Sequence, residues 1–180
     1  MIKFLRSLFA RGKNPSIIEI DDSGSGSLYG GIMILLNDGE NISYGEVSLK
    51  TFRIKDKKKR SAVVQKEIFK IIKKGLKNLS ASPQKTILKI CQGSLFNFSE
   101  KELEKKKFTV QRVQIRGETN DKAENLFHKI LKDKFNITTK DPKDYKGENL
   151  RQFAILKKRR DFKNVKRFVN GVEKIIQSSP

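Results

Sequence analysis

Residues 17 to 35 read IIEIDDSGSGSLYGGIMIL, and this stretch decides the fold. An apolar, β-branched run ends at the adjacent aspartates Asp21 and Asp22, and a serine–glycine segment separates it from a second apolar run. This pattern predicts two strands joined by a turn. Two like charges at the end of a buried strand repel each other unless a cation, a basic side chain or water relieves them, so the pair is a candidate metal site. The alternative is a plain turn in which the Asp side chains bond nearby backbone amides.

Downstream, the sequence alternates between strand and helix patterns. Asn37-Asp38-Gly39 predicts a hairpin that leads to a third strand over 42–52, with Gly45 as a candidate bulge. A helix is expected over 61–79, capped by Ser61 and preceded by a solvated charge run over 55–60. The remaining expected elements are a strand ending near Gly93, a polar helix capped by Ser99, a strand over 108–117 and a helix over 119–135.

Three antiparallel strands followed by alternating helices and strands is the order of the ribonuclease H-like fold, an α/β fold with a mixed sheet flanked by helices. The opening stretch also resembles the first strand and hairpin of the type 2 ribonucleases H. In that family the strand ends in Asp-Glu, followed by a small residue, Gly-any-Gly and a glycine that opens the second strand. The matching residues here are Asp21, Asp22, Ser23, Gly24, Ser25, Gly26 and Gly30. The resemblance covers roughly residues 16 to 136. A weaker resemblance, to the PIWI-like branch of the fold, rests on QGSLFNFSEKELEK at 92–105.

The resemblance implies a metal-dependent phosphodiester-cleaving enzyme that uses Mg²⁺ or Mn²⁺ at a two-metal site. It implies catalytic and metal-binding roles for Asp21, Asp22 and Asp121. Backbone groups of Gly24, Ser25 and Gly26 would contact the sugar-phosphate chain. Glu67 and Glu118 are further candidate metal ligands.

The sequence departs from the family at two places. Gln92 stands where the family has an aspartate, on the strand that follows the helix expected over 61–79, and Asp22 replaces the usual glutamate. A neutral amide is a poorer ligand for a hard cation than a carboxylate.

Each further candidate has a structural alternative. Glu67 has Lys70 three residues on as an ion-pair partner, which is common on helix surfaces. Asp121 with Glu124 three residues later is typical of a capping-box helix start, so cap and ligand both stay open. His128, the only histidine, is either a surface residue or a proton-transfer group.

The charge balance favours a polyanionic partner. There are 40 Lys+Arg against 20 Asp+Glu, a formal net charge of +20, and the basic residues cluster in 50–74 and 145–180. Such a field attracts phosphate backbones, so RNA, a duplex or an RNA/DNA hybrid is the expected partner. The alternative is a solvated helix face. The predicted contacts are Lys57, Lys58, Lys59, Arg60, Lys157, Lys158, Arg159 and Arg160.

Composition excludes several other classes. One cysteine, Cys91, rules out an internal disulfide and a multi-cysteine zinc site, and no apolar run is long enough to span a bilayer. A cytoplasmic protein without membrane association is expected, and no protein partner is indicated. The expected organisation is a basic N-terminal segment over 1–14, a core over 15–136, and a linker with a basic helical tail over 137–180. In that tail, a stripe of apolar residues is expected to pack on the core: Val165, Phe168, Val169, Val172 and Ile176.

The sequence therefore predicts a divergent metal-dependent nuclease of the ribonuclease H-like type that acts on RNA or an RNA/DNA hybrid. Two alternatives stay open. The first is a nucleic-acid-binding module of the same fold that has lost catalysis, with Gln92 as the mark of that loss. The second is a structural RNA-binding protein in which the Asp-Asp segment is only a turn.

Overall fold

A computed structural model describes residues 15–138, 145–160, 162–166 and 172, which form an α/β fold with a mixed sheet of five strands and four helices. The strands are β1 (Ser16–Ser23), β2 (Ile32–Asn37), β3 (Ile42–Val47), β4 (Thr86–Cys91) and β5 (Thr109–Val113). The helices are α2 (Lys57–Asn78), α3 (Asn97–Lys105), α4 (Glu118–Phe135) and α5 (Tyr145–Arg159). Short 3-10 turns occupy Thr51–Arg53, Ser94–Phe96 and Phe162–Asn164. The predicted segment 1–14, and Phe168, Val169 and Ile176 of the tail stripe, lie outside the described residues.

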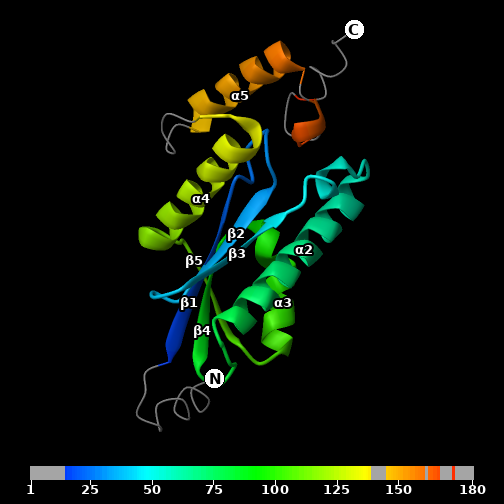
Figure 1. The fold of residues 1–180 in the computed structure, drawn as a ribbon. Helices are drawn as coiled ribbons and strands as arrows, with labels where there is room; N and C mark the ends of the chain where they lie inside the picture. The colour runs from blue at the N-terminus through cyan, green and yellow to red at the C-terminus, as the bar shows by residue number, and fades with distance from the viewer. Residues whose placement is uncertain (1–14, 139–144, 161, 167–171, 173–180) are drawn as a thin grey trace.

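The sheet order is β3-β2-β1-β4-β5. The strand β2 pairs antiparallel with both β1 and β3, whereas β4 pairs parallel with both β1 and β5. This arrangement is compatible with a ribonuclease H-like fold. The helices α2 and α3 lie on one side of the sheet and α4 lies on the other, while α5 lies beyond the end of α4 (Figure 1). The sequence correctly predicted the element order because the apolar spacing changes from two to about 3.6 residues at each step.

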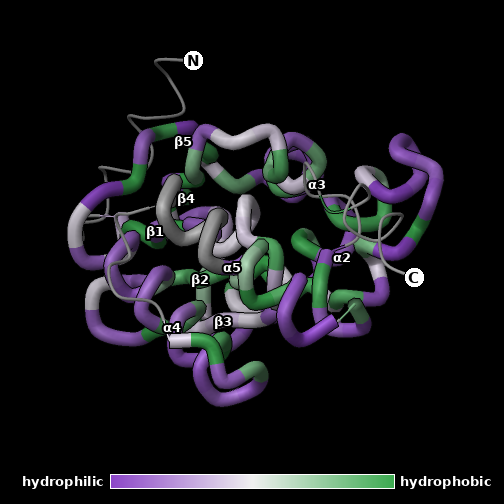
Figure 2. The backbone as a smooth tube through the Cα atoms, turned by 90° about the horizontal axis from the view of Figure 1, so that it is seen from above, coloured by the Kyte–Doolittle hydropathy of each residue, from purple (hydrophilic) through white to green (hydrophobic). Residues whose placement is uncertain are grey.

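Each face of the sheet carries its own hydrophobic cluster. On one face, Ile18, Ile20 and Ile34 pack with residues such as Ile68 and Ile72 of α2. On the other face the cluster joins the loop before β2 to α4, α5 and the segment after α5. Its buried members are Leu28, Tyr29, Met33, Phe127, Leu131, Ile137, Leu156, Val165 and Val172. Figure 2 shows hydrophilic residues along the outer turns of the molecule. The β2 strand is buried at every position because both clusters cover it.

The start of α2 differs from the prediction. The charge run over 55–60 is not a loop, because the helix begins at Lys57 and Ser61 lies in its second turn. The cap is Asp56, whose side chain accepts a hydrogen bond at 2.6 Å from the backbone amide of Lys59. The apolar residues whose spacing predicts this helix, Val64, Ile68, Ile72 and Leu76, are buried.

Two smaller predictions are also wrong. The β2–β3 register runs without interruption through the pair Ile34–Gly45, so Gly45 forms no bulge. A Cβ atom there would lie 2.9 Å from the Ile71 side chain of α2, so the glycine instead lets the helix approach the strand. Ser99 does not cap α3, because that helix begins at Asn97 and Ser99 is buried within it.

No helix among the described residues is both long and apolar enough to cross a membrane.

Candidate metal and nucleic-acid site

The aspartate pair lies inside the end of β1, not in a turn after it. Asp21 pairs with Leu35 and Asp22 with Ile34 across the antiparallel ladder, and the tight turn begins only at Gly24. The side chain of Asp21 is 3 % exposed, while Asp22 is half-buried. Strand pairing therefore fixes both backbones, and two carboxylate groups are held near each other at the end of a central strand.

The start of α4 is bound to β1 beside this pair. Asn120 donates a hydrogen bond from Nδ2 to Oδ2 of Asp21 at 3.2 Å, and the backbone amide of Asp22 donates to Oδ1 of Asp21 at 2.9 Å. One residue earlier on α4, Thr119 donates to Glu19 at 2.6 Å. These hydrogen bonds satisfy the buried carboxyl group of Asp21 and hold it in a fixed orientation.

The surroundings of Asp22 favour its neutral form. Burial raises the pKa of Asp22 to about 6, and the negative charges of Asp21 and Glu124 act in the same direction. A hydrogen bond from Ser25 and the charge of Lys166 oppose this shift without cancelling it. Burial is the largest cause of this shift, and a divalent cation at this position would oppose it by stabilising the charged carboxylate.

Cys91 completes a group of three possible ligand atoms. The β1–β4 register pairs Ile20 with Ile90, so the next residue along β4 comes beside Asp21. One ligand atom from each of Asp21, Asp22 and Cys91 lies within 4.8 Å of the other two, and no second group of this kind occurs among the described residues. Burial raises the pKa of the Cys91 thiol, and its hydrogen bond to Asp21 raises it further. Carboxylate oxygens suit hard cations and thiolates suit softer metals, so the two aspartates would be the preferred ligands of a hard cation in this group.

The other predicted ligands do not join this group. Glu67 accepts a hydrogen bond from the backbone amide of Ser48, and no shared ligand group contains it. Glu118 forms an ion pair with Lys122 at 2.7 Å. Asp121 is exposed in the first turn of α4.

The capping alternative for Asp121 is wrong, because the residue that precedes this helix is Gly117 and no side chain caps it. Glu124, predicted only as part of that cap, instead contributes to the electrostatics of Asp22. It also lies 3.8 Å from the half-buried His128 in an ion-pair arrangement on α4.

The Gly24–Gly26 segment divides into two different positions. Gly24 is buried with φ +80°, and a Cβ atom there would lie 2.3 Å from the Phe127 ring. It therefore lets the chain turn against α4 and is not an open contact for a ligand. Gly26 is exposed, and a Cβ atom there would have no atom within 4 Å. Only the Ser25–Gly26 part of the predicted nucleic-acid contact is accessible.

Two residues from distant segments hold this loop. Lys166 is 2 % exposed, and its Nζ donates to the backbone carbonyls of Gly24 and Ser27, the latter at 3.0 Å. Burial lowers the pKa of Lys166 to about 7, while the charges of Glu46 and Asp22 partly oppose this shift.

Gln152 of α5 holds the other side of the loop. Its Oε1 accepts from the backbone amide of Leu28 at 2.7 Å and from the Ser27 hydroxyl at 3.1 Å. The loop that follows the aspartates is thus fixed by residues more than 120 positions away in the sequence.

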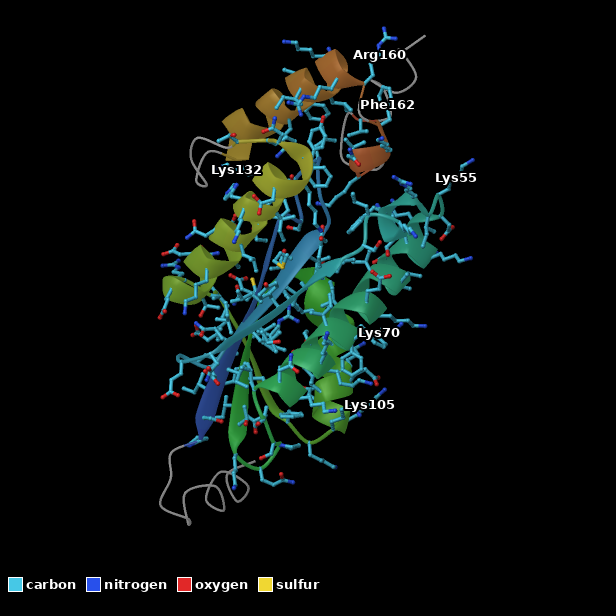
Figure 3. The ribbon with its side chains drawn as sticks, viewed as in Figure 1. Lys55, Lys70, Lys105, Lys132, Arg160 and Phe162 are labelled. Carbon is cyan, nitrogen blue, oxygen red and sulfur yellow. The ribbon has the colours of Figure 1, made fainter. Side chains whose placement is uncertain are left out.

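Basic side chains lie around the end of the molecule where α5 holds the loop after the aspartates. Lys57, Lys58 and Lys59 are exposed, whereas Arg60 is half-buried and donates to the carbonyls of Ile54 and Lys55. The four predicted residues of α5 and its C-terminal flank, 157 to 160, are all exposed. Figure 3 shows Lys55 and Arg160 at the end of the molecule where α5 lies. Because the Arg53 guanidinium donates to the carbonyl of Lys163, the two basic segments are in direct contact through their flanks.

Sequence reasoning missed three residues of the site, namely Cys91, Lys166 and Gln152. Cys91 had a signal in the sequence, because it is next to Gln92, the position matched to the family's aspartate. Which of the two residues comes beside Asp21 depends on the register between β4 and β1, and a difference of one residue in that register exchanges them. Lys166 and Gln152 had none, since a basic tail reads as solvent-exposed.

No protein-family model matches this chain, and no curated protein matches it significantly. What the site does must therefore be argued from its chemistry.

Proposed function

We propose that this protein is a divergent metal-dependent nuclease of the ribonuclease H-like type, acting on RNA or an RNA/DNA hybrid. The observation that carries the proposal is the Asp21–Asp22 pair at the end of the central strand β1, beside the parallel strand β4. The strand order β3-β2-β1-β4-β5 is compatible with that fold. The net charge of +20 supplies the field that attracts a phosphate backbone.

The residues fit one hard divalent cation. Asp21 and Asp22 offer carboxylate oxygens, and the raised pKa of Asp22, caused first by burial and then by the charge of Asp21, would fall if a cation bound. When bound, Mg²⁺ or Mn²⁺ supplies an activated water and stabilises charge on the phosphate. The protein's own part is to hold both carboxylates through Asn120 and the strand ladder. Ser25 and Gly26 remain open to a nucleic-acid strand.

A second candidate is a nucleic-acid-binding module of the same fold without catalysis. Cys91, with its raised thiol pKa, and exposed Gln92 stand at the end of β4 where the resembled family has an aspartate. That site would then have fewer carboxylates than a two-metal reaction uses.

The test is incubation of labelled RNA/DNA hybrid with the protein and Mn²⁺, in parallel with Asp21→Asn. Cleavage that requires both Mn²⁺ and Asp21 is the expected result. A thermal-shift series checks the metal directly, because Mn²⁺ should raise the Tm of the wild type and leave Asp21→Asn unchanged. Asp133→Asn, on the exposed side of α4, is the matched control and should behave like the wild type.

The outcomes separate the candidates. Hybrid binding without cleavage, together with an Asp21-dependent metal shift, would favour the binding module. Equal metal shifts in the wild type and Asp21→Asn would refute the metal site itself.

A further inference from the structure

The outer face of α2 carries a row of lysines. Residues 59, 66, 70, 73 and 77 follow one another at intervals of three, four or seven, which places them on one side of an α-helix. We call Lys59, Lys66, Lys70, Lys73 and Lys77 the lysine stripe. All five are exposed, and the stripe lies opposite the buried face that includes Val64, Ile68 and Ile72. Lys70 projects from the side of α2 that faces away from the sheet (Figure 3).

Within the described residues, no acidic side chain forms an ion pair with a lysine of the stripe. The only acid in α2 is Glu67, and its carboxylate accepts from the amide of Ser48. Successive lysines of the stripe, such as Lys66 and Lys70, are like charges one helical turn apart, which destabilises a helix. A polyanion bound along the stripe would remove that repulsion.

The helices α3 and α4 mix their charges, so a basic surface is not common to every helix of the protein. The α3 helix pairs Lys105 with Glu102 at 2.6 Å, and α4 pairs Lys122 with Glu118 at 2.7 Å. In α2, nine basic residues accompany one acid, whereas in α4 four basic residues accompany four acids. Of the helices that the structure describes, α5 alone shares this imbalance, with five basic residues and one acid.

The shape of the stripe fits a rigid, extended polyanion. From Lys59 to Lys77 it spans about 27 Å at 1.5 Å per residue. That length corresponds to about eight base pairs of a duplex at 3.4 Å each. Single-strand binding uses exposed aromatic rings on which bases stack. The exposed large hydrophobic residues of the described chain are Ile17, Ile42 and Tyr44, none of them on α2, and Phe69 of α2 packs edge-on against Phe98.

The segment that leads into α2 contacts the side chain that holds the loop beside the aspartate pair. Lys166, which donates to Gly24 and Ser27, also lies over the Phe52 ring at 5.5 Å. Phe52 belongs to the 3-10 turn four residues before α2.

We propose that the lysine stripe of α2 is a phosphate-binding track for a nucleic-acid duplex, and that it extends the contact surface away from the aspartate pair. The proposal rests on the proposed function only in taking nucleic acid as the partner. It requires no metal and no cleavage. Binding along the track is independent of base sequence, because lysines contact phosphates and not base edges.

The test measures binding of a labelled 24-base-pair RNA/DNA hybrid by fluorescence anisotropy at several salt concentrations, with EDTA present to prevent cleavage. The triple variant Lys66→Gln, Lys70→Gln, Lys73→Gln removes the middle of the stripe. The control Lys85→Gln, Lys101→Gln, Lys106→Gln removes the same charge from exposed positions outside α2. Circular dichroism verifies that both variants are folded.

The stripe variant is expected to weaken binding at least tenfold at 100 mM salt. The slope of log Kd against the logarithm of the salt concentration should be smaller than that of the wild type by about two to three, because each lost phosphate contact lowers the slope by about 0.9. The control should change the Kd by less than about threefold, since it leaves the stripe in place.

Other results would overturn the proposal in distinguishable ways. Equal losses in both variants would show a diffuse field, and no loss in the stripe variant would leave the proposed function intact without the track. Tighter wild-type binding to a single strand than to the hybrid would refute the duplex. Equal binding of polyglutamate of matched charge would refute nucleic acid as the occupant, and failure of the wild type to bind any nucleic acid would refute the proposed function as well.

Discussion

At the scale of single residues, the charged form of Asp22 is unfavourable to the fold. Burial and the charges of Asp21 and Glu124 raise its pKa to about 6 from the unfolded value of 3.8. A carboxyl group whose pKa is higher in the folded state stabilises the protein fully below pH 3.8. That contribution is lost as the pH rises through about 6. A charged Asp22 at neutral pH is therefore unfavourable unless a cation binds.

Asp22→Asn is accordingly expected to stabilise the metal-free protein at pH 7.5, by about 1–3 kcal/mol. Urea denaturation in EDTA measures this difference, and it should shrink towards zero at pH 4. Asp38→Asn is the matched control, because hydrogen bonding from the Asn41 amide lowers the pKa of Asp38. That substitution should not stabilise the protein at pH 7.5. A destabilised Asp22→Asn at pH 7.5 would contradict the assignment.

The two glycines of the Gly24–Gly26 segment predict opposite responses to the same substitution. Gly24→Ala places a methyl group 2.3 Å from the Phe127 ring at φ +80°, so we expect a loss of about 2–4 kcal/mol in the free energy of unfolding. Gly26→Ala meets no atom within 4 Å and should change it by less than about 0.5 kcal/mol. Equal effects in thermal or urea denaturation would refute the different roles of these positions.

At the scale of elements, α5 supports the loop after β1. Gln152→Leu keeps a side chain of similar size but removes the acceptor for the Leu28 amide and the Ser27 hydroxyl. Leaving a buried amide unpaired costs about 1–3 kcal/mol, so a comparable loss of stability is expected in urea denaturation. Gln84→Leu, at an exposed position before β4, is the control and should be near neutral. A neutral Gln152→Leu would mean that the loop holds its shape without α5.

Periodicity predicted the elements well, and local capping chemistry decided where the prediction failed. The buried faces of α2 and α4 follow from apolar spacing alone. The start of α2 does not, because Asp56 caps it and the following lysines form its first turn. Gly45 resembled a bulge, but the side chain that requires a glycine there, Ile71, comes from a helix that packs on the strand. Such packing is not visible in a local pattern.

At the scale of the whole molecule, two clusters cover the two faces of one sheet, and the second depends on the C-terminal part of the described chain. Leu156, Val165 and Val172 are buried against Leu28 and Tyr29. A chain that stops after residue 138 is therefore expected to expose part of this cluster, because several of its apolar members would be missing. Increased dye binding and a Tm lower by more than 10 °C, measured with the full chain as control, are the expected results. An unchanged Tm would refute a shared core.

The candidate site could be predicted from the sequence only in part. Asp21 and Asp22 are adjacent in the chain, so a single stretch was enough to find them. Cys91 reaches them through a strand register, and Lys166 through the packing of a distant segment. The positions of Cys91 and Lys166 in the site are not determined by their neighbours in the sequence, so a local motif could not reveal either residue.

The support of the Gly24–Ser27 loop by Lys166 has a consequence for how the protein is made. Ser16 and Thr86 bond across β1 and β4 at a separation of 70 residues, and Lys166 bonds Gly24 at a separation of 142. A ribosome adds about 5–20 residues per second, so residue 166 is joined roughly 7–30 s after residue 24. The five strands of the sheet can pair before residue 166 is added, whereas the Gly24–Ser27 loop gains its hydrogen bonds to Lys166 only afterwards. The nascent chain therefore lacks the Lys166 contacts to the Gly24–Ser27 loop until residue 166 has been added.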